Sequence, residues 1–267
     1  MDLRELGTQA STQKPGTRHP WETARARFFC GVIQHRAHSD RALHVLDVGA
    51  GDGFLGSALL RELAPGSRVT CFDPHYTAEH LDRFSAGATA GLSFCRDLPA
   101  ERFDLVLLLD VLEHIEDDVA LLASLITNSL AQEGAVLVSV PAHPLLFSQH
   151  DVALGHHRRY DASALATMLN QAGLSIVRSG GLFHSLILPR AITKLVERAR
   201  GVRSMPVASA PLSHAATEVG NWQGGPMLTS ALGAVLAFDN RVSSLTANLG
   251  LALPGLSVWA LAKKAAA

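Results

Sequence analysis

The chain has 267 residues, of which 48% are hydrophobic and 18% charged, which excludes disorder for most of its length and allows a sizeable core. Its 23 basic and 24 acidic residues give a formal net charge of -1, which excludes a global field that would attract nucleic acid or an anionic membrane. The 3 cysteines are widely spaced, which argues against a disulfide framework and indicates a reducing, cytoplasmic setting.

The N-terminal segment, residues 1–20, contains acidic side chains and no apolar run of signal-peptide length, so we expect a flexible tail there. The remaining residues, 21–267, are expected to form one domain. Its expected parts are an N-terminal helix, a cofactor-binding core, a helical insertion that acts as an acceptor lid, and a final strand, at residues 21–42, 43–180, 181–254 and 255–267.

Apolar strand-like runs alternate with helical stretches from residue 43 onward, which predicts an α/β fold with a doubly wound, mostly parallel sheet of seven strands. The continuous apolar run at 105–109 is typical of a central strand that helices cover on both faces. The predicted strands are Leu43–Val48, Arg68–Asp73, Gly91–Cys95, Phe103–Asp110, Ala135–Val140, Leu174–Ser179 and Leu256–Ala262. The predicted helices are Trp21–His38, Leu55–Leu63, Ala78–Phe84, Asp117–Leu130, Ser163–Ala172, Leu182–Arg200 and Met227–Leu249.

A glycine-rich turn follows the first predicted strand and precedes a helix. Gly49, Gly51 and Gly53 would let backbone amides approach a ligand where side chains would block it. The run GDGFLG also has the dinucleotide spacing G-x-G-x-x-G, so an NAD(P)-dependent oxidoreductase stays open. Asp47 lies two residues before the first glycine, where it is poorly placed for a pyrophosphate and well placed for a cationic amino-acid ligand.

Acidic residues recur at the ends of the predicted strands. Asp73 ends the second strand, where open sheets of this kind present an acidic side chain to ribose hydroxyls. This role serves dinucleotides and other ribose-containing ligands equally. The alternative is a tight strand-to-helix turn whose aspartates only cap backbone groups.

Four segments carry a resemblance to a known family: LDVGAGDGFLG, FDP, CRDLP and FDLVLLLDVLEHIEDD. In this order and spacing they resemble the successive cofactor motifs of class I S-adenosylmethionine-dependent methyltransferases, particularly the small-molecule group that includes ubiquinone-biosynthesis O-methyltransferases. The resemblance covers residues 43 to about 180 and implies a Rossmann-like methyltransferase fold, S-adenosylmethionine as cofactor and a small-molecule acceptor.

The same resemblance implies which residues bind the cofactor. Asp47 and the glycines would line its methionine part, Asp73 its ribose, and Asp97 with the Leu98 backbone its adenine. The residues after the fourth strand would border the pocket beside the transferred methyl group. The complete set is Asp47, Gly49, Ala50, Gly51, Gly53, Asp73, Pro74, Asp97, Leu98, Asp110 and Val111.

The loops after Asp110 and Val140 should build the acceptor side, because ligands in open α/β sheets bind at the carboxyl ends of the strands. Methyl transfer from a sulfonium is an in-line displacement, so alignment supplies much of the acceleration. A hydroxyl acceptor of high pKa would need a base, and a histidine with a pKa near ~6.5 suits that task. The predicted catalytic residues are His114, ranked first because it follows the strand closely, then His156 and His143. The alternative is that Glu113 and His114 only stabilise the loop or cap the following helix.

The segment GHHRRYD resembles a G-H-x-R-R-Y-like signature in bacterial methyltransferases associated with glycan and lipid biosynthesis. Its adjacent arginines could clamp a phosphate or carboxylate of the acceptor. The predicted substrate-binding residues are His150, Asp151, Arg158, Arg159 and Tyr160. The alternative is that one arginine pairs with Asp151 or Asp161 and holds the loop.

Histidines are dense in this part of the chain, which raises the question of a metal. The spacings match no helix-based ligand pair and no cysteine joins them, so we predict no metal site among His143, His150, His156 and His157.

The late helical segments, GLFHSLILPRAITKLVERARGVR and PMLTSALGAVLAFDNRVSSL, combine apolar faces with bordering basic residues. They could rest on the inner membrane face and admit a lipid-linked acceptor, or serve as core or homodimer contacts. The predicted partner is therefore a small-molecule acceptor, anionic or lipid-linked, and no nucleic acid. A catalytically inactive, cofactor-binding partner subunit is the third class that stays open.

Overall fold

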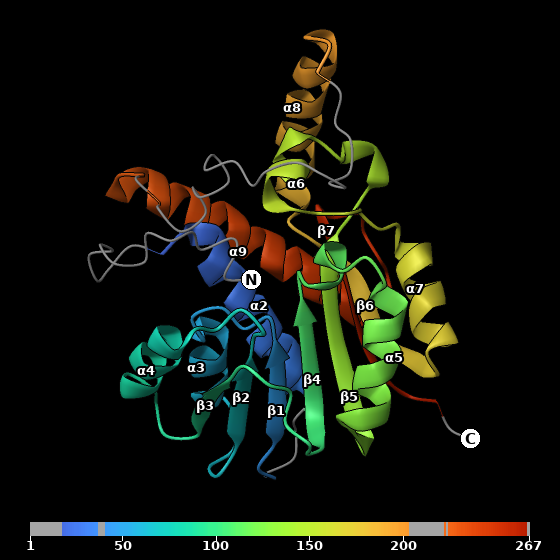
Figure 1. Ribbon diagram of the computed structural model, residues 1–267. Helices are drawn as coiled ribbons and strands as arrows, with labels where there is room; N and C mark the ends of the chain where they lie inside the picture. The colour runs from blue at the N-terminus through green and yellow to red at the C-terminus, as the bar shows by residue number, and fades with distance from the viewer. Residues whose placement is uncertain (1–17, 37–40, 203–221, 223, 266–267) are drawn as a thin grey trace.

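The computed structural model describes residues 18–36, 41–202, 222 and 224–265. Nearly all of the expected N-terminal tail lies outside these residues. The described chain forms a seven-stranded sheet in the order β3-β2-β1-β4-β5-β7-β6 (Figure 1). All neighbouring strands are parallel except β7, which runs antiparallel to both β5 and β6. The predicted fold class is confirmed. The strands are β1 His44–Val48, β2 Arg68–Phe72, β3 Leu92–Cys95, β4 Phe103–Leu109, β5 Leu130–Pro141, β6 Leu174–Leu182 and β7 Ser257–Lys264.

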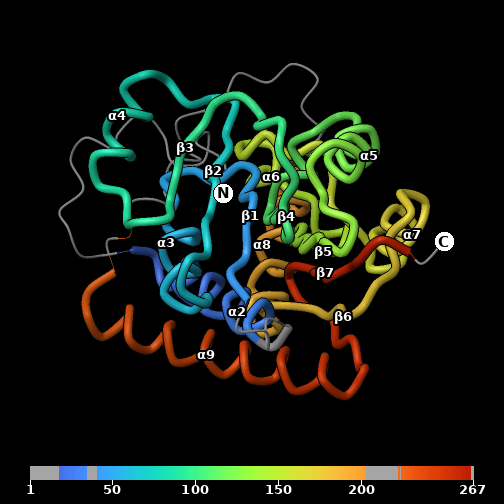
Figure 2. Tube along the Cα trace, turned by 90° about the horizontal axis from the view of Figure 1, so that it is seen from below, coloured from blue at the N-terminus to red at the C-terminus, as the bar shows by residue number. Residues whose placement is uncertain are grey.

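Helices cover both faces of the sheet, as the view along it shows (Figure 2). One apolar core lies between the sheet and α2, α3 and α9, and a second lies between the opposite face and α5 and α7. The α-helices are α2 Pro20–Arg36, α3 Phe54–Leu60, α4 Ala78–Ala86, α5 Asp118–Asn128, α6 Gln149–Leu154, α7 Ala162–Gln171, α8 Ile187–Ala199 and α9 Pro226–Asn248. The short 3-10 helices are η1 Leu112–His114, η2 Pro144–Leu146 and η3 His184–Leu186.

Several predicted boundaries differ from the structure, and the errors at β5 and β6 have a tertiary cause. Strand β5 begins at Leu130, which the helical pattern had assigned to the preceding helix. Leu130 is fully buried and pairs with Phe103 next to a register shift. This strand pairing therefore outweighs the helical pattern of the preceding residues. Strand β6 runs on through Gly181, where a Cβ atom would lie 2.3 Å from the carbonyl oxygen of Leu253. The glycine therefore permits a close backbone approach that continues the strand.

The carboxyl ends of the parallel strands β1, β2, β4 and β5 meet at one edge of the sheet, and antiparallel β7 starts there. Helices α6 and α8 stand beyond this edge, with α8 projecting outward from the body of the protein (Figure 1). Helix α6 was not predicted. Its Gly155 C-cap has a φ of 77°, the left-handed conformation that ends a helix without steric cost. The sheet edge and α6 together form the region in which a site is expected.

Candidate active site

The turn Asp47–Gly53 connects β1 to α3 and depends on glycine at two points of close approach. Gly49 has a φ of +67°, and a Cβ atom there would lie 3.0 Å from Cγ2 of Val111. Gly53 has a φ of +73°, and its Cβ atom would lie 2.6 Å from the Phe94 ring. The Gly49 amide donates to the Phe72 carbonyl at 2.8 Å, which ties the turn to β2. The turn thus presents bare backbone at the sheet edge, as a nucleotide-type ligand requires.

Two buried carboxylates stand beside this turn. Asp47 is 4% exposed, and its pKa is raised to about 6, mainly because burial disfavours the ionised form. The Asp73 charge raises this pKa further, whereas Arg25 partly offsets the rise. The Asp73 carboxylate accepts a hydrogen bond from the His75 amide at 2.9 Å. A ligand cation would find in Asp47 a carboxyl group that ionises readily when a positive charge arrives.

Asp110 directly follows β4 and has a left-handed conformation, with a φ of 58°. Its amide donates to the Ser139 carbonyl at 2.8 Å, and the Ser139 hydroxyl donates to its carboxylate at 3.3 Å. Arg25 forms an ion pair with the same carboxylate at 3.0 Å. A non-glycine residue held in this region stores backbone strain, which is found most often at functional sites.

Arg25 is a site residue that sequence reasoning missed. It lies on α2, 8% exposed, and lines a cavity with Asp47 and Ala50 at the glycine turn. Trp21 and Phe29 flank its guanidinium at 5.2 and 5.9 Å from their ring centroids. The available signal was an arginine four residues from each aromatic, on the apolar face of a predicted helix, where a charged side chain needs a partner.

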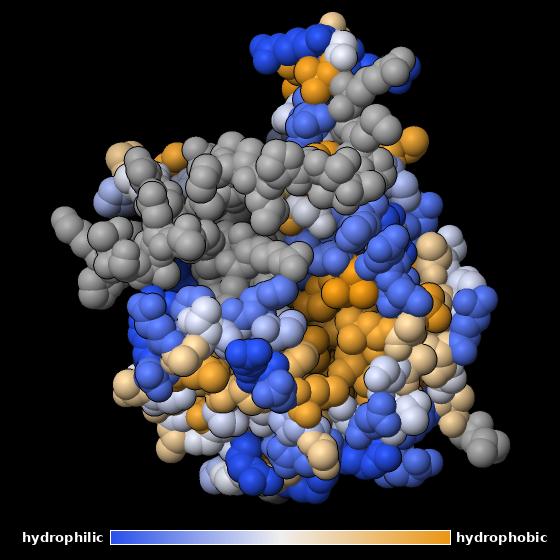
Figure 3. Space-filling model, in the orientation of Figure 1, coloured by the Kyte–Doolittle hydropathy of each residue, from blue (hydrophilic) through white to orange (hydrophobic). Residues whose placement is uncertain are grey.

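The other residues expected to contact the cofactor lie along the same edge. Ala50 donates its amide to the Phe72 carbonyl at 3.3 Å, and exposed Pro74 follows Asp73 directly. Asp97 and Leu98 lie exposed in the loop after β3. Figure 3 shows apolar surface gathered in a hollow in front of β4 and beside α5. An aromatic base can pack on apolar surface of this kind.

A second cavity of about 290 Å³ opens beyond Asp110, under α6. Pro141 at the end of β5 and Ser257 at the start of β7 form part of its wall. Its ionisable lining residues are His19, Asp110, Glu113, His150, His156 and Arg159. Asp110 belongs to this cavity and its partner Arg25 to the cavity at the glycine turn, so the two cavities meet at one ion pair.

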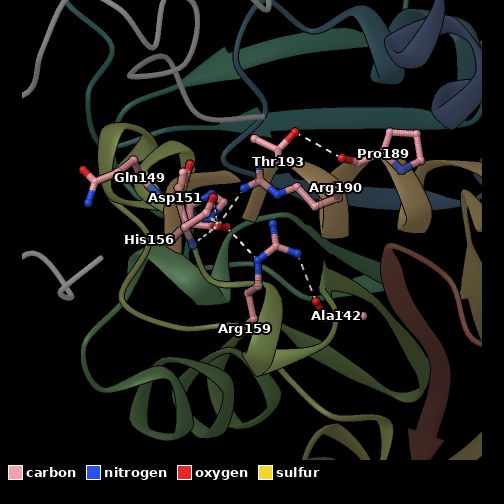
Figure 4. A network of polar contacts seen from close by, with 10 residues as sticks. Ala142, Gln149, Asp151, His156, Arg159, Pro189, Arg190 and Thr193 are labelled. Atoms are coloured by element: carbon pink, nitrogen blue, oxygen red, sulfur yellow. Dashed lines mark hydrogen bonds and ion pairs between the residues drawn. The ribbon is translucent and has the colours of Figure 1, made fainter. Parts of the chain in front are cut away.

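Asp151 organises the wall of this second cavity (Figure 4). Its fully buried carboxylate accepts from His156 Nδ1 at 3.0 Å, Arg159 at 2.8 Å and Arg190 at 2.7 Å. Burial alone would raise the pKa of Asp151. The hydrogen bond from His156 and the charges of the two arginines outweigh burial, however, and hold the pKa well below its usual range. Burial, followed by the Arg190 charge, lowers the pKa of His150 to about 4, so this imidazole is neutral at pH 7.

The adjacent arginines of the GHHRRYD segment point to different partners. Arg159 pairs with Asp151, whereas Arg158 pairs with Asp118 at 3.1 Å. The Tyr160 hydroxyl also donates to Asp118, at 2.6 Å. The structure therefore places His150 and Arg159 in the cavity lining, with Asp151 buried behind Arg159, and turns Arg158 and Tyr160 toward α5.

The three predicted catalytic histidines are not equivalent in the structure. His156 lines the cavity under α6, and the His114 ring lies edge-on to it with centroids 4.7 Å apart. His143 lines a separate apolar cavity of about 200 Å³, between β6, β7 and α7. The structure thus joins two of the three histidines and places the third elsewhere.

The arrangement defines a class of protein: a doubly wound α/β protein with a glycine-rich turn and an adjoining cavity at one sheet edge. Residues 21–179 match the model of a methyltransferase domain family, so the chain belongs to this family. Family membership identifies it as an S-adenosylmethionine-dependent methyltransferase, as the sequence predicted. No curated protein is similar to the chain in sequence at a significant level.

Several solved structures have the same fold at low sequence identity. A candidate sarcosine dimethylglycine methyltransferase from Galdieria sulphuraria has a TM-score of 0.53 and 14% identity, over 92% of this chain and 85% of that one. A candidate methyltransferase from Bacillus halodurans has a TM-score of 0.52 and 14% identity, over 89% and 99%. A Haloferax volcanii candidate methyltransferase, solved with a methyltransferase activator, has a TM-score of 0.52 and 14% identity, over 92% and 96%. Among the described residues, no helix is both long and apolar enough to cross a membrane.

Proposed function

We propose that the protein transfers the methyl group of S-adenosylmethionine to a small acceptor bound in the cavity under α6. The observation that carries this proposal is the Arg25–Asp110 ion pair, at 3.0 Å, which stands between the donor turn and that cavity. A donor whose methionine part lies on the turn directs its sulfonium toward this pair. The acceptor would then approach the methyl group beside this pair, from the side opposite the sulfur, as an in-line displacement requires.

The charges on the donor side suit the two ends of the methionine part. The buried Asp47 carboxylate attracts the ammonium group, and Arg25, next to it, supplies a positive charge for the carboxylate. Asp73 is the ribose ligand in this proposal, and Asp97 with the Leu98 backbone holds the adenine. The apolar hollow in front of β4 supports this orientation, because the base needs an apolar surface (Figure 3).

On the acceptor side, we propose that the reacting atom lies at the end of the cavity lined by His156, whose ring His114 contacts. His150 and Arg159 line the same cavity and contact the remainder of the acceptor. His143, Arg158 and Tyr160 are not part of this proposal, because they face a different cavity or α5. The lining combines several ionisable groups with apolar side chains, which favours an acceptor that carries both oxygen-containing and apolar parts.

The acceptor is proposed to be lipid-linked, and helix α8 supports this. Leu186 lines the cavity, and α8 begins at the next residue. Leu188, Ile192 and Leu195 on this helix are 68%, 54% and 66% exposed. An apolar stripe of this kind next to a cavity mouth can follow the tail of an amphiphilic acceptor, or rest on the surface that holds it.

Calorimetry with S-adenosylhomocysteine and with NAD tests the donor assignment. We expect S-adenosylhomocysteine to bind and NAD not to bind. Asp47→Ala should weaken the affinity by about 10- to 100-fold, as expected for losing a charge-assisted hydrogen bond. The matched control is Asp82→Ala, an exposed aspartate on α4, which should leave the affinity unchanged. Binding of NAD and not of S-adenosylhomocysteine would overturn the donor assignment.

The acceptor assignment needs a screen with radiolabelled donor. Sugars, quinones and polar small molecules should be offered in solution, and polyprenyl phosphates both in detergent and in vesicles. We expect label in an amphiphilic acceptor, and His156→Ala should reduce its rate of labelling by about 100-fold. Donor binding without labelling of any acceptor would favour the inactive partner subunit.

A further inference from the structure

Three metal-ligating side chains converge at the inner end of the cavity under α6. Glu113 and His114 belong to η1, directly after β4, and His156 follows α6. Their side chains are buried, at 0%, 8% and 5% exposure. One ligand atom from each residue lies within 4.8 Å of the other two. We propose that these three residues bind a divalent transition-metal ion.

The geometry is close to that of a ligated ion. Metal–ligand bonds of about 2.0–2.2 Å place neighbouring ligand atoms about 3–4 Å apart. Closing the observed separation of at most 4.8 Å needs only small rotations of side chains. Two of the ligands are adjacent in one turn of η1, so the backbone already holds them together.

Asp151 orients the histidine ligand that comes from the other loop. An ionised carboxylate only accepts hydrogen bonds, so the 3.0 Å contact puts the proton of His156 on Nδ1. Nε2 is then the nitrogen that can ligate an ion. A carboxylate behind a histidine ligand is the usual outer support of protein metal sites. Arg159 and Arg190 both pair with the same carboxylate, which offsets one of their two positive charges near the ion.

The ligand set indicates the kind of ion. Two imidazoles and one carboxylate suit Zn²⁺, Co²⁺, Mn²⁺ or Fe²⁺ better than Mg²⁺ or Ca²⁺, which prefer oxygen ligands throughout. Three protein ligands also leave coordination positions open.

Glu113 and His156 line the cavity, so an open position would face it. An acceptor oxygen bound there would be oriented and made more acidic. That role for the ion rests on the proposed function, whereas binding of the ion does not.

The test is metal binding by the full-length protein after treatment with a chelator. We expect one Zn²⁺ per chain by mass spectrometry after dialysis. Co²⁺ should give visible absorption bands of a site with nitrogen and oxygen ligands. Glu113→Gln and His156→Ala should each weaken Zn²⁺ affinity by at least about 100-fold. His150→Ala is the matched control, because it removes another histidine that lines the same cavity, and it should bind Zn²⁺ like the unaltered protein.

Affinity for S-adenosylhomocysteine, measured on the same samples, shows whether each variant is folded. Absence of stoichiometric Zn²⁺ and Co²⁺ from the unaltered protein would overturn the site, and so would unchanged affinity in either ligand variant. If Glu113→Gln fails to bind S-adenosylhomocysteine, His156→Ala alone decides. If the unaltered protein binds Zn²⁺ but not S-adenosylhomocysteine, the metal site is supported and the proposed function is contradicted.

Discussion

Asp47 on the proposed donor side and Asp151 on the proposed acceptor side are both buried aspartates, yet their surroundings shift their pKa values in opposite directions. Burial and the neighbouring Asp73 raise the pKa of Asp47 to about 6. Hydrogen bonding and two arginines overcome burial at Asp151 and hold its pKa well below the usual range. A cationic ligand group would therefore stabilise the ionised form of Asp47, whereas Asp151 is already stabilised by the protein's own arginines.

The two regions also differ in how the chain builds them. The donor turn is a continuous stretch between β1 and α3, so its ligand groups are neighbours in sequence. The Asp151 network instead joins α6 to Arg190 on α8, which is 39 residues away in sequence. The conformation of the turn between β1 and α3 therefore depends on neighbouring residues, whereas the Asp151 network depends on contacts between segments far apart in the sequence.

Asp151→Asn should have the largest effect on stability. The substitution leaves Arg159 and Arg190 without their charge partner in a buried site, so we expect the free energy of unfolding to fall by about 3–5 kcal/mol. Denaturant titration at pH 7 measures this. The pKa of Asp151 is lowered on folding, so its contribution is present above pH ~4 and is lost as the pH falls further.

A matched control for this substitution is Asp161→Asn, at an exposed N-cap position that makes no side-chain capping bond. It should change the free energy of unfolding by no more than about 0.5 kcal/mol. Equal effects of the two substitutions would remove the distinction between the buried Asp151 network and an exposed aspartate.

The donor side should respond to pH in the opposite sense. A pKa of about 6 means that Asp47 is mostly protonated at pH 5 and mostly ionised at pH 7. Its contribution to stability is present below pH ~4 and is lost as the pH rises through about 6. A ligand ammonium group prefers the ionised form, so affinity for S-adenosylhomocysteine should rise about tenfold from pH 5 to pH 7.

Calorimetry across this pH range checks the prediction, and Asp47→Asn serves as the control. The variant should bind weakly and with little change between pH 5 and pH 7. A pH dependence that persists in the variant would assign the titration to another group.

The smallest effect is expected at Arg158, beside the strongly paired Arg159. Its side chain is 37% exposed, so Arg158→Ala should lower the free energy of unfolding by less than about 1 kcal/mol. Arg159→Ala should lower it by about 3–5 kcal/mol, because it breaks a buried pair. Denaturant titration of both variants gives the comparison, and Arg158→Ala should leave the KM of the acceptor unchanged. A raised KM for the acceptor in Arg158→Ala would show that Arg158 contributes to acceptor binding.

Much of the fold was predictable because its signals are local. Buried parallel strands appear in the sequence as continuous apolar runs, and the turn after the first strand appears as a cluster of glycines. The boundary errors at Leu130 and Gly181 arose where pairing with a distant strand or loop overrode the local pattern. The additional length of β5 and β6 depends on the segments that pack against them, and the local sequence pattern carries no information about those segments.

The sequence by itself determined the class of fold and the donor turn, since backbone conformation and strand-end carboxylates depend on adjacent residues. Only the tertiary structure decided which ionisable groups meet. It brought Arg25 to Asp110, placed His156 beside His114, moved His143 to another cavity and turned Arg158 away from Arg159. The physical reason is that a buried charge is satisfied by whichever partner packing brings within reach, and packing joins residues far apart in the chain.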